Sequence, residues 1–328
     1  MSSDEIKVKS EEKMKKEFIA VTGATASGKT ALSVEIARRL DGEVISCDSM
    51  QIYKGMDVGT AKPTTEEQRG IPHHMIDILS PDADFSAGDY STMAGSIISD
   101  IISRKKVPVM CGGTFLYLDS MTTVSALSDS EKDEKLREEL KKYALENGNA
   151  ALHKMLSEID PEAAKSIHEN NVKRVIRAIE IYRATGKTKT FWDKKSKESE
   201  PPFQAHIIVI DYNDREILYD RINRRVDIMM ENGLEKEARG LYDKGLLDEK
   251  YSASQAIGYK EFIPYFKGEK SLTEVVSEIK QSSRNYAKRQ LTWLKRYTDA
   301  ARLTADNGDG GVKTTAELAD EALEKLNM

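Results

Sequence analysis

The sequence predicts an α/β fold: a mostly parallel sheet with helices on both faces, interrupted by an all-helical insertion domain. Short apolar runs alternate with helical stretches, as they do where covering helices join parallel strands. A glycine-rich pattern follows the first apolar run, and a long segment without strand-like sequence separates the early runs from a later one.

The first strand and helix enclose a phosphate-binding pattern. We expect a strand at 18–22 and a helix from Thr30 to about Leu40. Between them, Gly23–Thr30 matches G-x-x-x-x-G-K-[ST], in which backbone N–H groups and a helix N-terminus surround an anion. Lys29 adds a mobile charge, and the Thr30 hydroxyl can ligate Mg²⁺. The pattern predicts a P-loop-containing nucleotide-hydrolase-like fold that binds a di- or triphosphate. A chance match in an ordinary strand-turn-helix is the alternative.

The remaining core elements continue this alternation. A second strand is expected at 43–47, ending on Asp48, and a buried strand at 107–111 leads into Gly112-Gly113-Thr114. A polar, turn-rich stretch with three prolines separates these two strands. The further expected elements are a helix near 88–104, a strand at 206–211, and helices that include 215–232 and 271–297.

The segment from Ser130 to Phe191 contains amphipathic helical sequence and no strand-like run. The strand expected at 206–211 has no strand-like neighbours near it in the sequence, so the helical segment interrupts one domain. We therefore expect a disordered N-terminal extension at 1–17, an α/β core with C-terminal helices at 18–125 and 200–328, and a helical insertion at 126–199.

Composition narrows the class of protein. A hydrophobic fraction of 39% and a charged fraction of 32% are typical of a soluble globular protein. No run approaches the roughly 18 apolar residues of a membrane span, and the first residues are charged, unlike a signal peptide, so we expect a cytoplasmic protein with no membrane partner. Cys47 and Cys111 lack C-x-x-C spacing, which argues against a disulfide framework or structural zinc. Both are expected to be buried free thiols.

The distribution of charge indicates a polyanionic partner, although the net charge is −5. Residues 284–296 hold five basic residues and no acid, with Tyr286 and Trp293 among them. A solvated basic face is the equally weighted alternative. The larger basic stretch, 173–197, has Glu180 and Asp193 as its acids and contains Lys173, Arg174, Arg177, Arg183, Lys187, Lys189, Lys194, Lys195 and Lys197.

Asp48 is the second candidate functional residue. A carboxylate at the carboxyl end of the second strand lies where open α/β sheets bind ligands, and there it can accept a proton from a substrate nucleophile or hold a metal-bound water. The alternative is that Asp48 caps the residues that follow it. After the strand at 107–111, Gly112-Gly113-Thr114 stands where an energy-coupling NTPase would carry an acidic metal ligand. Transfer of a group to an acceptor is therefore the favoured class.

Seven motifs in chain order resemble the tRNA dimethylallyltransferase family. The resemblance extends from about residue 18 to residue 297 and so covers nearly the whole folded chain. The motifs are Gly23–Thr30, Asp48-Ser-Met-Gln-Ile-Tyr53, Gly59-Thr-Ala-Lys-Pro63, Pro72-His-His74, Gly112-Gly-Thr114, Ile257-Gly-Tyr-Lys260 and Ala287-Lys-Arg-Gln-Leu-Thr-Trp293.

The resemblance implies transfer of a dimethylallyl group from dimethylallyl diphosphate to N6 of the adenosine at tRNA position 37, beside the anticodon, with Mg²⁺ as the metal. It implies Asp48 as general base, Thr30 at the metal and Arg221 gripping the diphosphate, together as the catalytic residues. The implied diphosphate-binding residues are Gly23, Thr25, Ala26, Ser27, Gly28, Lys29 and Thr30. The implied tRNA-binding residues are Asp48, Ser49, Met50, Gln51, Thr114, Lys173, Arg174, Arg177, Ile257, Gly258, Tyr259 and Lys260.

The resemblance also implies that the helical insertion and the sheet domain clasp the anticodon stem-loop, which would give the basic stretch 173–197 a purpose. Two positions depart from the family pattern. Lys173 replaces a glutamine, which leaves one base contact in doubt, and Ala24 replaces a common proline in the loop. His73 and His74 match the family, and we expect a structural role for them. No interface-like apolar stripe stands out, so a monomer is expected.

Three other functions fit parts of the sequence. A small-molecule kinase would use the same loop and an aspartate after the second strand, and it would hydrolyse ATP or transfer its phosphoryl group. A prenyltransferase acting on free adenylate would share the core but would not need the basic insertion. A non-enzymatic RNA-binding module would account for the basic stretches but not for an intact phosphate loop together with Asp48.

Overall fold

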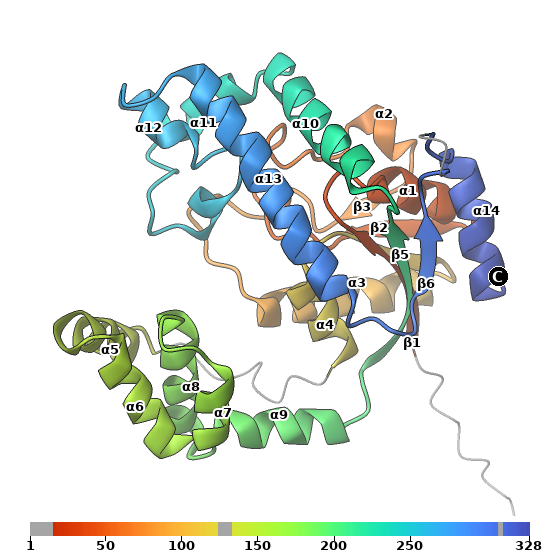
Figure 1. Cartoon of the computed structure of the whole chain (residues 1–328). Coiled ribbons are helices and arrows are strands. Elements are labelled where there is room, and N and C mark those ends of the chain that lie inside the picture. The colour runs from red at the N-terminus through yellow and green to blue at the C-terminus, as the bar shows by residue number, and fades with distance from the viewer. Residues whose placement is uncertain (1–15, 124–132, 308–310) are drawn as a thin grey trace, which may run out of the picture. The chain divides into compact units, whose positions relative to one another are not determined.

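The computed structural model describes residues 16–123, 133–307 and 311–328 (Figure 1). The chain divides into two compact units. The first consists of residues up to 84, 96–115 and 202–328, and the second of 85–95 and 116–201. Among the described residues, no helix is both long enough and apolar enough to cross a membrane.

The first unit is built on a six-stranded parallel sheet, with strand order β3-β2-β4-β1-β5-β6 in the described chain. Strand β1 is central, because it pairs with β4 on one side and with β5 on the other. The strands are β1 (Lys16–Gly23), β2 (Gly42–Ser46), β3 (His73–His74), β4 (Val107–Cys111), β5 (Phe203–Asp211) and β6 (Ala301–Thr304).

The sheet confirms the predicted fold class and the four predicted strands, and it adds β3 and β6 at its two edges. The expected extension at 1–17 was wrong for Lys16 and Glu17, which are in β1; its other residues lie outside the described chain. Lys16 and Glu17 are ordered because β5 begins at Phe203, before the predicted start, and pairs with them.

Helices cover both faces of this sheet. Ile208 and Ile210 of β5 face a core that includes Leu32 of α1 and Leu318 of α14. Val209, which points to the opposite face, packs with Leu294 of α13. The helices of this unit are α1 (Lys29–Arg39), α2 (Thr65–Gln68), α10 (Arg215–Glu231), α11 (Leu234–Asp243), α12 (Phe262–Phe266), α13 (Leu272–Leu294) and α14 (Thr315–Leu326), with a 3₁₀ turn at Ser252–Gln255.

Local sequence explains where several of these helices begin. Asp214 accepts a hydrogen bond from the N–H of Glu216 and so caps α10. Ser271 and Thr314 each form a capping box with a glutamate three residues later, at the start of α13 and α14 respectively. These caps place the long helices α10 and α13, which supply side chains to the phosphate loop.

The described parts of the second unit contain helices joined by turns and no strand. Its core includes Leu152, Leu156, Val175 and Ile179, which have no exposed surface. The described part of the expected insertion, residues 133–199, lies within this unit, which also takes in residues 85–95 and 116–123. Its helices are α5 (Glu134–Asn147), α6 (Asn149–Ile159), α7 (Pro161–Ser166), α8 (Val172–Thr185) and α9 (Lys189–Glu198), while α3 (Ala87–Ser103) and α4 (Phe115–Thr122) each belong to both units.

Candidate active site at the phosphate loop

The predicted phosphate-binding loop lies between β1 and α1. Gly28, at the start of α1, has φ +99°, in the left-handed region that favours glycine. A Cβ atom on Gly23 would lie 2.7 Å from Ser27 Oγ and 2.9 Å from the Ile210 carbonyl, so a larger residue would push the loop off β5. The first N–H groups of α1 have no acceptor within the helix, and its dipole favours an anion there. The backbone is thus shaped to receive phosphate oxygens.

Two side chains of the loop are poised for an anionic ligand. Lys29 Nζ donates to the Ala24 carbonyl oxygen at 2.6 Å, and burial lowers the pKa of Lys29 to about 8. Ser27 Oγ is buried and has no hydrogen-bond partner in the described structure. A buried hydroxyl without a partner is costly, so a ligand oxygen that bonds Ser27 would be stabilised.

Helix α10 adds two arginines to the loop. Arg221 Nε donates to the Ala26 carbonyl oxygen at 3.0 Å, which places its guanidinium beside the loop. Arg225 lies one helical turn later and is partly buried; burial lowers its pKa, and the nearby Asp48 carboxylate opposes that shift. The sequence indicated Arg221 through its family motif, whereas Arg225 was missed. The sequence could have indicated Arg225, because residues four apart on a helix lie on the same face and Arg221 was already predicted.

Asp48 follows β2, and its side chain stabilises the turn that begins there. Its Oδ1 accepts a hydrogen bond from the N–H of Met50 at 2.9 Å, so the capping alternative is part of its role. Its Oδ2 makes no hydrogen bond within the described chain. Thr114 Oγ1 accepts a hydrogen bond from the N–H of Ser49 at 3.0 Å, which links this turn to the end of β4. The carboxylate can therefore be held by one oxygen while the other accepts a proton.

The turn after β4 approaches β2 very closely. A Cβ atom on Gly112 would lie 2.0 Å from the Cys47 carbonyl oxygen, so glycine is required at that position. Gln290 of α13 donates to the Gly113 carbonyl oxygen at 3.1 Å and accepts from the N–H of Thr25 at 2.8 Å. Tyr286, one turn earlier, donates to the same Gly113 oxygen at 3.4 Å, and burial raises the pKa of its hydroxyl. Gln290 lies in the motif at 287–293, but the sequence did not predict it as a site residue.

The structure gives Gln51 and Tyr259 internal partners. Gln51 Nε2 donates to the carbonyl oxygens of Thr60 and Ala61, at 3.2 Å and 3.3 Å, and its Oε1 accepts from Ser46 Oγ at 2.8 Å. Tyr259 has no exposed surface, so its ring supports the loop of residues 57–59 and does not form an outer surface. Lys260 is exposed.

The predicted basic residues of the insertion lie on α8 of the second unit. Lys173 and Arg174 are exposed in the first turn of that helix. Arg177 instead donates to Glu180 Oε2 at 2.5 Å, and Arg137 of α5 bonds the same buried carboxylate. The Arg137–Glu180 contact therefore joins α5 to α8, and Arg177 pairs with Glu180 within α8, whereas Lys173 and Arg174 point a positive charge at solvent.

The two cysteines and the two histidines of β3 are at least partly buried within the described chain. Cys47 is buried, as predicted, while Cys111 is only partly buried, and burial raises the pKa of its thiol. His74 Nε2 lies 2.8 Å from Glu43 Oε2, and the ring of His73 bonds the Ile71 carbonyl at 2.8 Å.

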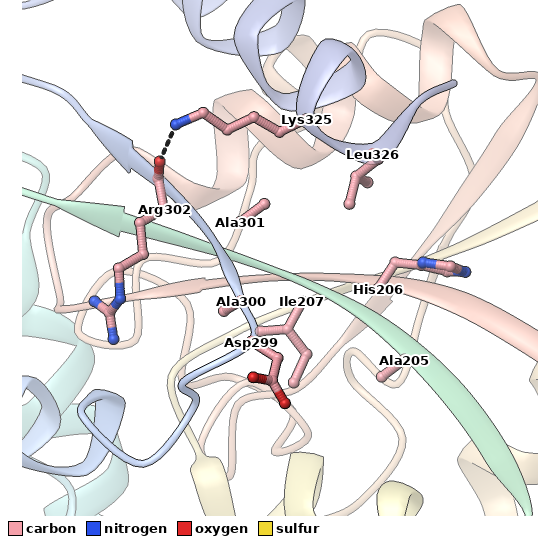
Figure 2. A pocket seen from close by; sticks show the side chains of 9 residues that line it. All are labelled: Ala205, His206, Ile207, Asp299, Ala300, Ala301, Arg302, Lys325 and Leu326. Carbon is pink, nitrogen blue, oxygen red and sulfur yellow. Dashed lines mark hydrogen bonds between the residues drawn. The ribbon is translucent and has the colours of Figure 1, made fainter.

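A surface pocket lies away from the phosphate loop, beside strands β5 and β6 (Figure 2). It is lined by residues 205–207 of β5, by residues 299–302 at the start of β6, and by the end of α14, where Lys325 Nζ donates to the Arg302 carbonyl oxygen at 2.6 Å. The phosphate loop lies at the carboxyl ends of the strands, where ligands of parallel sheets bind. This pocket is therefore not the candidate active site.

The residues at the loop suit Mg²⁺ held in part by a ligand. Among the described residues, no group of three or more His, Cys, Asp and Glu side chains could form a metal cage. Mg²⁺ commonly uses one or two protein oxygens, several waters and substrate phosphates. The Thr30 hydroxyl at the start of α1 and the Asp48 carboxylate after β2 carry oxygen atoms of the kind that such a site uses.

Comparison with known proteins gives consistent matches over most of the chain. The family model described as IPP transferase matches residues 51–297. The tRNA dimethylallyltransferase of Bacillus cytotoxicus is 46% identical over 318 residues, which cover 97% of this chain and 98% of the relative. That of Thermoanaerobacter sp. is 47% identical over 282 residues, covering 86% and 89% respectively.

Solved structures agree with these matches. The tRNA isopentenylpyrophosphate transferase of Bacillus halodurans is 43% identical, with a TM-score of 0.68, and covers 95% of this chain and 99% of its own. A eukaryotic dimethylallyltransferase acting on tRNA is 29% identical, with a TM-score of 0.78, and covers 90% and 75% respectively.

Proposed function

The chain belongs to the IPP transferase family, and we infer from this membership that it acts as a tRNA dimethylallyltransferase. It transfers a dimethylallyl group from dimethylallyl diphosphate to N6 of the adenosine at tRNA position 37, and N6-isopentenyladenosine and diphosphate are the products. The observation that carries this inference is identity of 46% along 97% of the chain, which includes the phosphate loop and Asp48.

We propose that the phosphate loop holds the diphosphate of the donor. The first-turn N–H groups of α1, the partly buried Lys29 and the orphaned Ser27 hydroxyl would bind its oxygens. Arg221 reaches the loop from α10, and Arg225 follows one turn later. These groups stabilise negative charge where it develops, because the diphosphate is the leaving group.

The transfer step uses Asp48 as general base. The N6 lone pair attacks C1 of the dimethylallyl group, and the C1–O bond breaks with its electron pair leaving on the diphosphate. The proton lost from N6 passes to Asp48 Oδ2, the oxygen left free by the Met50 contact. The contact with Met50 fixes the direction of the carboxylate, so the base is already oriented before the adenine enters.

The Thr30 hydroxyl is the proposed protein ligand of Mg²⁺, and the metal would add positive charge beside the leaving diphosphate. Removal of divalent metal with EDTA should abolish turnover, and added Mg²⁺ should restore it. Full activity in excess EDTA would count against the metal assignment.

The RNA would be bound by groups on both units. On the second unit, Lys173 and Arg174 are exposed and suit phosphate contacts, and on the first unit Lys260 does. To reach N6, the target base must leave the stack of the anticodon loop, which costs a few kcal/mol. We further propose that the protein acts as a monomer, which sedimentation at micromolar concentration would test.

Separate measurements of binding and turnover test the role of Asp48. Asp48→Asn keeps an oxygen that can accept the Met50 N–H, but an amide cannot take the N6 proton. We expect turnover to fall by about a thousandfold or more, with tRNA affinity within about threefold of wild type. Equal loss of tRNA binding and turnover would contradict the general-base role. Asp82→Asn, the same change at an exposed carboxylate outside the site, is the matched control.

A further inference from the structure

Glu237 of α11 makes an unusual set of contacts for a surface-helix carboxylate. It accepts three consecutive backbone N–H groups, from Asp57 and Val58 at 2.9 Å each and from Gly59 at 3.0 Å. It also accepts the hydroxyl of Tyr259 at 2.6 Å. Successive N–H groups that converge on one carboxylate form a strong, charge-assisted contact. The Glu237 carboxylate thus holds the backbone of residues 57–59 in place.

Tyr259 closes the same contact from the other side. Its ring has no exposed surface, and burial raises the pKa of its hydroxyl. A Cβ atom on Gly59 would lie 2.5 Å from two carbons of this ring, so the loop of residues 57–59 lies directly on it. The motif that contains Tyr259 and the motif that contains Gly59 therefore meet through Glu237, which belongs to neither.

The loop held by Glu237 is tied to the turn that carries Asp48. Gln51, the last residue of the segment Asp48–Gln51, bonds the carbonyl oxygens of Thr60 and Ala61. Lys62 Nζ donates to the Tyr53 carbonyl oxygen and to Asp57 Oδ1, both at 2.6 Å. A displacement of residues 57–59 would consequently move Gln51 and the turn before it.

We propose that Glu237 is a positioning residue for the tRNA substrate, and that it acts through residues 57–61 and Gln51. This proposal rests on the proposed function and on the tRNA contact that the family resemblance implies for residues 48–51. Glu237 does not belong to the phosphate loop, so its loss should affect the RNA substrate and spare the diphosphate. That selectivity separates positioning from general stabilisation of the fold.

The test compares Glu237→Gln with Glu235→Gln. A glutamine at 237 keeps one oxygen but turns an NH₂ group toward donors that need an acceptor, so exposed and partly buried N–H groups of residues 57–59 lose their charged partner. Glu235 lies on the same helix and also accepts a tyrosine hydroxyl, from Tyr265 of α12 at 2.9 Å. The two variants remove the same charge from the same helix, but the second leaves residues 57–59 held by Glu237.

Steady-state kinetics with each substrate varied in turn provide the readout. We expect E237Q to lower kcat/KM for tRNA by about tenfold, with KM for dimethylallyl diphosphate within about twofold of wild type. E235Q should leave both values within about twofold. Equal losses for the two substrates in E237Q, or no loss at all, would overturn the proposal.

If E237Q does not fold, a second variant tests the positioning role of residues 57–59. Gly59→Ala drives a Cβ atom into the Tyr259 ring and displaces the same loop while keeping Glu237. It should produce the same tRNA-selective loss, and a loss confined to the diphosphate would overturn the proposal. If wild-type protein forms no isopentenyladenosine, the proposed function fails. If the wild type is active and both variants match it, only the positioning role fails.

Discussion

Gln290 accepts a hydrogen bond from the backbone N–H of Thr25 at 2.8 Å, across 265 residues of sequence. Its amide nitrogen donates to the Gly113 carbonyl oxygen, so one buried side chain of α13 joins the phosphate loop to the turn after β4. The Thr25 N–H, which the sequence assigned to the diphosphate, is thus already used inside the protein. The diphosphate would rely on the later N–H groups of the loop.

Gln290→Ala should loosen this junction. The change leaves the Thr25 N–H and the Gly113 carbonyl without their buried partner, which should cost about 2–3 kcal/mol of unfolding free energy. KM for dimethylallyl diphosphate should rise as the loop loses its anchor. Urea unfolding and steady-state kinetics measure the two effects. Gln281→Ala, an exposed change on the same helix, should alter neither; similar losses in both variants would count against the junction.

Two of the arginines of α10, Arg221 and Arg225, should matter for the donor. Arg221→Ala and Arg225→Ala should each lower kcat/KM for dimethylallyl diphosphate by roughly 10- to 100-fold, because positive charge is lost where the leaving group becomes more negative. Arg224→Ala removes the same charge from an exposed site between them and should change kcat/KM by less than about twofold. If Arg224→Ala lowers kcat/KM by as much, the loss comes from the reduced net positive charge and not from contacts of Arg221 and Arg225 with the diphosphate.

The exposed basic residues of α8 should contribute to RNA affinity through phosphate contacts. Lys173→Ala and Arg174→Ala should each weaken tRNA binding and lower the salt dependence of the binding constant by about one unit of slope. Filter binding at several salt concentrations measures both. Lys142→Ala on α5, which removes an exposed charge in the same unit, is the control. An unchanged slope in the α8 variants would contradict phosphate contact.

Glu43 should make stability depend on pH. Its side chain is 4% exposed and bonds Arg104 and His74, and the hydrogen bond from Arg104 lowers its pKa from 4.5 to about 2. Since the folded-state pKa lies below the unfolded value, this stabilisation is complete above about pH 4.5 and is lost as the pH falls toward 2. Because Arg104 is partly exposed, we discount the effect to roughly 1–2 kcal/mol.

Urea unfolding of Glu43→Gln and wild type at pH 7 and pH 3.5 checks this direction. The difference in unfolding free energy should be smaller at the lower pH, because the Glu43 carboxyl of the unfolded chain, with its ordinary pKa of 4.5, takes up a proton there while the folded one stays ionised. A difference that stays constant or grows on acidification would show that the Arg104 contact does not hold the pKa down. Glu17→Gln, at a half-exposed contact with His206, should show a difference below about 0.5 kcal/mol at either pH.

The central strands and the phosphate loop could be predicted because their signals are local. Strands β1, β2 and β4 are apolar runs buried on both faces, and the spacing of Gly23, Gly28 and Lys29 carries the loop chemistry directly. The edge strands could not be predicted in this way. β3 consists of two histidines between turns, and β6 has four residues of mixed polarity; both are strands because a longer neighbour pairs with them.

The contacts that support the site depend on the tertiary fold. Gln290 and Glu237 lie on amphipathic helices, where a polar residue has no distinguishing local pattern, and their partners are far away in the sequence. Tyr259 shows the reverse case. Its motif indicated an RNA contact, but an aromatic ring in a short loop can face either way, and here it faces the interior.

The central claim is tested most directly by the nucleoside product. Purified protein, Mg²⁺ and dimethylallyl diphosphate are incubated with unmodified tRNA or with AMP, and the digested nucleosides are then resolved by mass spectrometry. We predict isopentenyladenosine from tRNA alone, at the adenosine beside the anticodon. Product from AMP alone would indicate a free-adenylate prenyltransferase. Absence of product from both, with ATP-dependent phosphoryl transfer instead, would contradict the proposed use of the phosphate loop.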